Sequence, residues 1–118
     1  MFKSLRVPVL FALALAAPQL ALAHAVLVAS TPKLNGVVHG NQLHIDLKFN
    51  SRIDGPRCTL SLVSPDAPAH ALKLAAQTSP DAIASDANGL RPGAYTLRWQ
   101  ALAADGHITR GEIPFRVE

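Results

Sequence analysis

Residues 43–49 read Leu-His-Ile-Asp-Leu-Lys-Phe, with apolar and polar side chains in strict alternation. Successive side chains of a β-strand point to opposite faces, so this period of two predicts a strand with one buried face. The same alternation recurs further along the chain, at residues 58–62, 95–101 and 113–117. A further short strand is expected at Ala25–Ala29, with weaker candidates at Ala71–Leu74 and near Ile83.

Turn-forming residues separate these segments. Proline, glycine, asparagine and aspartate gather at residues 31–36, 54–56, 64–66, 88–89 and 91–93. No helical period is evident after residue 23, and the pattern is weakest at Ala67–Ala87. About seven short strands with frequent turns predict an all-β domain, a small antiparallel, immunoglobulin-like Greek-key β-sandwich or barrel. In that fold Trp99 is expected in the core between the sheets.

The first 23 residues have the pattern of a secretory signal peptide. Lys3 and Arg6 precede a short apolar run, and Ala21-Leu22-Ala23 supplies the small residues that signal peptidase requires. An uncleaved N-terminal anchor is the alternative, but the apolar run is too short for a permanent membrane span. We therefore predict a signal peptide at residues 1–23, a domain at residues 24–118 and a periplasmic location.

Charge and cysteine content narrow the class of protein further. The chain has 11 basic and 8 acidic residues, and two of the basic ones lie in the predicted signal peptide, so the domain is nearly neutral. It shows no basic cluster of the kind that binds nucleic acid, and we expect a monomer without a nucleic-acid partner. Cys58, the single cysteine, cannot form an internal disulfide and is expected as an inert core thiol.

His24 is the first candidate metal ligand, because cleavage after Ala23 would give it a free α-amine. That amine and the imidazole of the same residue can close one chelate ring on a metal ion. An α-amine has a pKa of about 7.7–8.0, so a bound cation displaces its proton readily near neutral pH. The alternative is that histidine occupies this first position by accident.

Asp105-Gly106-His107 is the second candidate feature. Residues i and i+2 of an extended segment point to the same side, which would place a carboxylate beside an imidazole. The alternative is an ordinary tight turn, because Asp-Gly is a common hairpin dipeptide.

One metal suits both features. An amine, two imidazoles and a carboxylate form the nitrogen-rich set that tetragonal copper(II) prefers, whereas zinc gains nothing from a planar arrangement. Copper(I) favours thioether and thiolate ligands, and the only methionine, Met1, lies in the predicted signal peptide. The sequence therefore predicts one Cu(II) ion per mature chain, held by His24, Asp105 and His107.

The other histidines are weaker candidates. His44 alternates with apolar residues and is expected on the outer face of its strand, while His39 and His70 are expected in loops. All three are interpreted as solvated surface side chains. His39, beside Gly40, is the first to reconsider as an accessory ligand.

The sequence resembles the CopC family of bacterial periplasmic copper-binding proteins. The similarity lies in four places, at residues 24–32, at 43–50, at 95–101 followed by 105–107, and at 111–117. The resemblance implies a Greek-key barrel or sandwich with copper(II) at one end, bound by the amine and imidazole of His24, by Asp105 and by His107. Many members also carry a methionine-rich copper(I) site, which this chain lacks, so it is similar to the members with the copper(II) site alone.

Three functions are compatible with these features. The preferred hypothesis is a non-enzymatic copper carrier or buffer in copper homeostasis or resistance, and the resemblance implies a CopD-type inner-membrane copper transporter as its partner. A copper oxygenase with an amino-terminal histidine brace is the second, although the domain is short and has few aromatic residues. A non-metal structural module of immunoglobulin type is the third, and it requires both His24 and Asp105–His107 to be coincidences.

Overall fold

The alternating stretch at residues 43–49 forms β3 (Leu43–Phe49) in the computed structural model, which describes residues 24–118. Its four apolar side chains are all buried and its three polar ones are all exposed, as the period of two predicts. One hydrophobic core collects these side chains with those of the other strands. The all-β sandwich prediction is confirmed.

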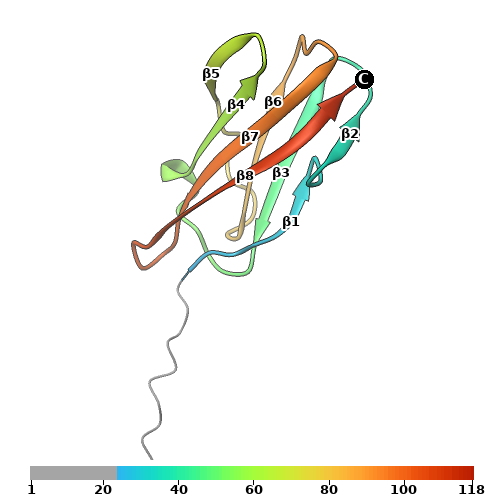
Figure 1. Ribbon diagram of the computed structural model, residues 1–118. Helices are drawn as coiled ribbons and strands as arrows, with labels where there is room; N and C mark the ends of the chain where they lie inside the picture. The colour runs from blue at the N-terminus through green and yellow to red at the C-terminus, as the bar shows by residue number, and fades with distance from the viewer. Residues whose placement is uncertain (1–23) are drawn as a thin grey trace, which may run out of the picture.

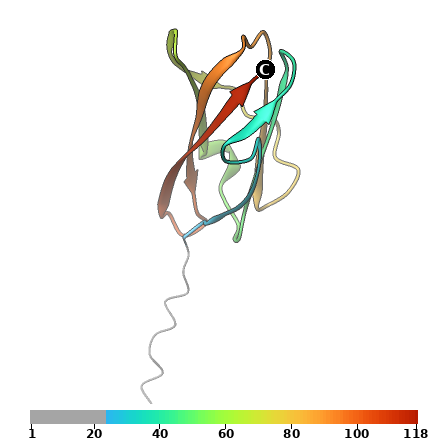
Figure 2. The same cartoon turned by 45° about the vertical axis from the view of Figure 1, so that its right-hand side comes forward.

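Two sheets enclose this core (Figures 1 and 2). The smaller sheet has the order β1-β3-β6, with β1 at Leu27–Thr31 and β6 at Ala82–Ala87. The larger has the order β2-β8-β7-β4-β5, and its strands are β2 (Gly36–Val38), β8 (Ile108–Val117), β7 (Gly93–Leu102), β4 (Thr59–Ser64) and β5 (Ala67–Leu72). A single turn of 3-10 helix, η1 (Gly55–Arg57), precedes β4.

The β7–β8 hairpin is the longest paired unit, with its register running from Gly93 opposite Val117 to Leu102 opposite Ile108. Each strand has ten residues. The loop that follows β7 is therefore separated from the loop that precedes it by the length of the sandwich. This separation defines two ends of the molecule, and the N-terminal segment begins at the end where β7 turns into β8 (Figure 1).

The strand count differs from the prediction in one place. The described residues form eight strands, and the additional one is β2, which begins at the last residue of the turn expected at residues 31–36. β2 pairs in parallel with β8, whereas the sequence predicted an antiparallel sandwich. The cause is the turn after β1, where the Asn35 N–H donates to the carbonyl of Pro114 and carries the chain across to the larger sheet.

Trp99 joins the two sheets near the β7–β8 turn. Its ring packs edge-on against Phe49 of β3 with a centroid separation of 5.3 Å, and both side chains are buried. Opposite Trp99 on β8 lies Gly111, where an added Cβ would come within 2.5 Å of Cζ2 of the indole. The indole therefore occupies the space that a side chain at residue 111 would need.

The predicted signal peptide, residues 1–23, lies outside the described residues. Within residues 24–118 no helix has the length and apolar character needed to cross a membrane.

We predict that Gly111→Ala destabilises the fold by about 1–3 kcal/mol, because the added methyl group overpacks against Trp99. Trp99→Ala should cost about 3–5 kcal/mol through the cavity it leaves. In the Trp99→Ala background the effect of Gly111→Ala should fall below about 1 kcal/mol, since the clashing ring is gone. Denaturant unfolding of the four proteins measures this coupling.

The neighbouring Glu112→Ala is the control. It removes an exposed ion pair with Arg98 and should change the free energy of unfolding by less than about 1 kcal/mol. Additive effects of Gly111→Ala and Trp99→Ala would contradict the packing described above.

Candidate metal centre

His24 lies at the end of the sandwich where β7 turns into β8, on the segment that leads into β1. Its side chain is exposed, whereas the next residue, Ala25, is buried with 1% of its surface accessible. The carbonyl of Ala25 accepts a hydrogen bond from Oγ1 of Thr109 in β8 at 2.8 Å. The first residue of the predicted mature chain is thus held against the strand that follows His107.

Asp105 and His107 lie in the turn between β7 and β8. The turn is closed by hydrogen bonds from the Gly106 N–H to the carbonyl of Ala103 and from the Ala103 N–H to the carbonyl of His107. Gly106 has a φ of +91°, which a residue with a side chain rarely adopts. The tight-turn interpretation of Asp105-Gly106 is therefore correct, and the turn also brings the carboxylate and the imidazole together.

The Asp105 carboxylate is directed at His107 with both oxygens. Oδ1 accepts a hydrogen bond from the His107 backbone N–H at 3.1 Å, and Oδ2 contacts Nδ1 of the imidazole. A histidine whose Nδ1 is held by a carboxylate has its ring orientation fixed and its Nε2 left for a metal.

The imidazoles of His24 and His107 lie next to each other at this turn. Their ring centroids are 5.0 Å apart and their planes are inclined by 63°. The two residues are far apart in the sequence, and both are exposed. The structure thus brings together all three predicted ligands, His24 and His107 directly and Asp105 through its contact with His107.

The electrostatics of the turn favour a cation. The pKa of Asp105 is lowered first by the hydrogen bond from the His107 backbone N–H and further by the His107 side chain, although partial desolvation opposes the shift. Asp105 therefore stays ionised well into the acid range and leaves a negative charge beside two imidazoles.

Side chains alone do not complete a metal site in this form of the chain. Across residues 24–118, no group of three or more histidine, cysteine, aspartate or glutamate side chains is arranged to hold a metal ion. Asp105 is turned toward His107, and the nitrogen of His24 is an amide while residue 23 is attached. The additional donor that the sequence analysis invoked, a free α-amine, exists only after cleavage.

A comparison with protein families shows to which family the chain belongs. The model of the CopC domain matches residues 27–118. The chain belongs to the CopC family. The resemblance drawn from the sequence is confirmed, and membership links the chain to copper. The match includes Asp105 and His107 and begins just after His24.

Solved structures show the same fold. CopC from Methylosinus trichosporium OB3b has a TM-score of 0.71 at 23% identity, covering 80% of this chain and 94% of that one. PcoC from Escherichia coli, described as a methionine-rich copper resistance protein, has a TM-score of 0.65 at 22% identity, covering 80% and 99%. At these identities the likeness concerns the fold. No curated protein matches the sequence.

The remaining histidines of this CopC domain lie away from His24 and His107. His39 directly follows β2, whose last residue pairs with Val117 at the far end of β8 from His107, so it is no accessory ligand. His70 lies on β5, and its predicted placement in a loop is wrong. His44, as expected, is on the outer face of β3, near the end opposite to Phe49.

His44 lies between two carboxylates on the outside of the smaller sheet. Its Nδ1 is 2.9 Å from Oδ1 of Asp86 and its Nε2 is 2.7 Å from Oδ2 of Asp46. The hydrogen bond with Asp86, followed by that with Asp46, raises the pKa of His44. Because the two carboxylates occupy opposite ring nitrogens, they do not converge with the imidazole on one point.

We predict from this arrangement that His44 titrates above the usual range of a free histidine. Its folded pKa is raised, so the stabilisation is present at low pH and is lost as pH rises through the folded value. Asp86→Asn should lower the pKa toward the usual range, and a proton NMR titration of the imidazole measures it. Asp105→Asn, at the other end, should leave it unchanged. A wild-type pKa at or below the usual range would refute the contacts.

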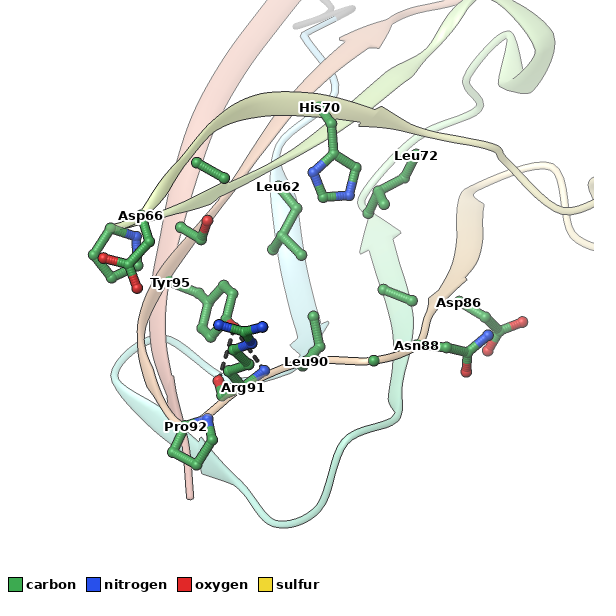
Figure 3. A pocket seen from close by; sticks show the side chains of 15 residues that line it. Leu62, Asp66, His70, Leu72, Asp86, Asn88, Leu90, Arg91, Pro92 and Tyr95 are labelled. Atoms are coloured by element: carbon green, nitrogen blue, oxygen red, sulfur yellow. Dashed lines mark hydrogen bonds between the residues drawn. The ribbon is translucent and has the colours of Figure 1, made fainter.

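A pocket of about 510 Å³ opens at the end opposite to the His24–His107 pair (Figure 3). It lies where β5 and β6 diverge, beyond the bridge that joins Leu74 to Ser85. Its floor includes Tyr95, whose hydroxyl donates to the carbonyl of Arg91 at 2.7 Å and accepts the N–H of the same residue. It contains none of the three predicted ligands.

Cys58 is buried, as the alternation at residues 58–62 predicted, with 4% of its surface accessible. Its Sγ donates to the carbonyl of Asp54 at 3.2 Å, and burial raises the pKa of the thiol. A protonated, enclosed thiol is a poor metal ligand.

Proposed function

We propose that this CopC-family chain is a periplasmic protein that binds one Cu(II) ion at its mature amino terminus and thereby buffers or carries copper. The observation that carries the proposal is the 5.0 Å approach of the His24 and His107 rings. Both rings are exposed, which allows an incoming ion to reach them and a partner to take it away.

The proposed donors are the α-amine and imidazole of His24 and Nε2 of His107, with the Asp105 carboxylate beside them. Two imidazoles and an amine match the preference of Cu(II) for a tetragonal, nitrogen-rich set. Asp105 keeps Nδ1 of His107 engaged and contributes negative charge, as an oxygen ligand or as the group that orients the ring.

The surroundings of the proposed metal centre favour a copper carrier over a copper enzyme. The pocket in Figure 3 lies at the opposite end, so it offers no substrate cleft beside the copper. Two structural relatives support a copper function, since one is CopC and the other is described as a copper resistance protein. We further propose delivery to a CopD-type inner-membrane transporter, with the chain acting as a monomer.

The amino terminus provides the sharpest test. Adding one glycine before His24 keeps the imidazole but converts the amine to an amide, which has no free lone pair for a metal unless it is deprotonated. Cu(II) affinity should then fall by orders of magnitude while thermal stability is unchanged, because His24 lies outside the core. A Cu(II) competition titration of the correctly processed and the extended proteins measures the difference.

Two substitutions complete this experiment. His107→Ala should also weaken Cu(II) binding, and by more than Asp105→Ala, because imidazole is the better copper(II) ligand. His44→Ala is the control and should bind as the wild type does, since His44 lies at the other end of β3. Equal affinity of the processed and extended proteins would exclude the α-amine as a ligand.

The chain has no methionine after Met1, and a second prediction about the metal follows from this. Copper(I) should bind far more weakly than Cu(II), because the proposed set contains no thioether and Cys58 is enclosed. A competition titration with a copper(I)-specific chelator under reducing conditions measures it. Tight binding of copper(I) that is lost in Cys58→Ser would contradict the proposed donor set.

A further inference from the structure

Three hydrogen bonds fix the backbone directly after His24, and they tie it to both sheets. Thr109 Oγ1 in β8 donates to the carbonyl of Ala25 at 2.8 Å, and the bond is partly buried. Asn50, directly after β3, accepts the N–H of Val26 on its Oδ1 at 2.8 Å and donates its own N–H to the Val26 carbonyl at 2.9 Å. Residues 25 and 26 therefore link β8 of the larger sheet to the end of β3 in the smaller sheet.

The position of Thr109 relates this bridge to the metal centre. Thr109 lies near the start of β8, two residues after His107, and Ala25 lies one residue after His24. The hydroxyl thus provides a direct connection between the backbones that carry the two imidazoles. Without it, the segment that carries His24 would lose a direct hydrogen bond to β8, and the first residues of the mature chain would fray more readily.

We infer that Thr109 is a positioning residue for copper, and that Asn50 assists it. Resting on the proposed function, this inference deepens it by naming what holds the amino-terminal chelate in register with His107. A chelate that is ordered before the ion arrives loses less conformational entropy on binding. A flexible His24 would bind Cu(II) alone or with water in place of His107.

Thr109→Val tests this inference, because valine keeps the shape and removes the hydroxyl. In the correctly processed protein, Cu(II) affinity should fall by about two- to tenfold, the range expected for one lost hydrogen bond. The electron paramagnetic resonance spectrum of the Cu(II) protein should change from one species to a mixture. Thr109→Ser restores the hydroxyl and should restore both the affinity and the single spectrum.

Ser30→Ala is a matched control. It removes a comparable partly buried bond from a side chain to a backbone carbonyl, that of Ser30 Oγ to Pro32 at 2.8 Å, at the other end of β1. It should leave the copper spectrum unchanged, even if it lowers the thermal stability as much as Thr109→Val does. Asn50→Ala provides a second test and should reproduce the mixture of species.

The outcomes separate the two claims. Unchanged affinity and spectra in both Thr109→Val and Asn50→Ala, with tight Cu(II) binding in the wild type, would overturn the positioning role alone. Equal disturbance by Ser30→Ala would overturn it as well, because the effect would then be one of general stability. A wild-type protein that fails to bind Cu(II) tightly would overturn the proposed function and this inference together.

Discussion

The contact between Trp99 and Phe49 holds the two sheets together at the end that carries the proposed metal centre. Phe49 is the last residue of β3, and Asn50, which fastens the N-terminal segment, follows it directly. Trp99 lies on β7 two residues before Ala101, so the two side chains point to the same face. Ala101 pairs with Thr109 of β8. The spacing of the sheets at this contact therefore determines where the backbone beside His24 meets the backbone beside His107. Gly111 makes the contact possible because a side chain there would displace the indole.

The proposed site combines two different parts of the fold that lie at the same end of the domain. His107 and Asp105 occupy a hairpin turn with its own hydrogen bonds, whereas His24 precedes a segment that is held by hydrogen bonds to Thr109 and Asn50. On this account, removal of the signal peptide supplies the missing donor. A chain that still carries residues 1–23 has the two imidazoles but only an amide nitrogen at His24. Copper binding would then be confined to the processed protein.

Much of the fold was predictable because its strands are buried on one face only. The alternation at residues 43–49 gives the burial of β3 residue by residue, and Trp99 lies in the core as expected. β2 could not be predicted, because its three residues depend on a long-range hydrogen bond between Asn35 and Pro114. His70 was misplaced since β5 is exposed along most of its length, so that it has no apolar alternation to mark it.

The candidate site was predictable as a set of residues, because an amino-terminal histidine and Asp-Gly-His are visible in the sequence. The approach of His24 to His107 was not, since it depends on the pairing of segments that are distant in the chain. Thr109 and Asn50 carry no recognisable motif, and only their contacts with residues 25 and 26 reveal them. The contact of His44 with Asp86 depends likewise on the register between β3 and β6, which places the two residues opposite each other.

A crystal structure of the processed protein, residues 24–118, with one equivalent of Cu(II) tests the central claim most directly. The account predicts a single copper ion bonded to the α-amine and imidazole of His24 and to Nε2 of His107, with Thr109 still donating to the carbonyl of Ala25. Copper bound beside His44, Asp46 and Asp86, or bound to His107 without the amino terminus, would contradict it.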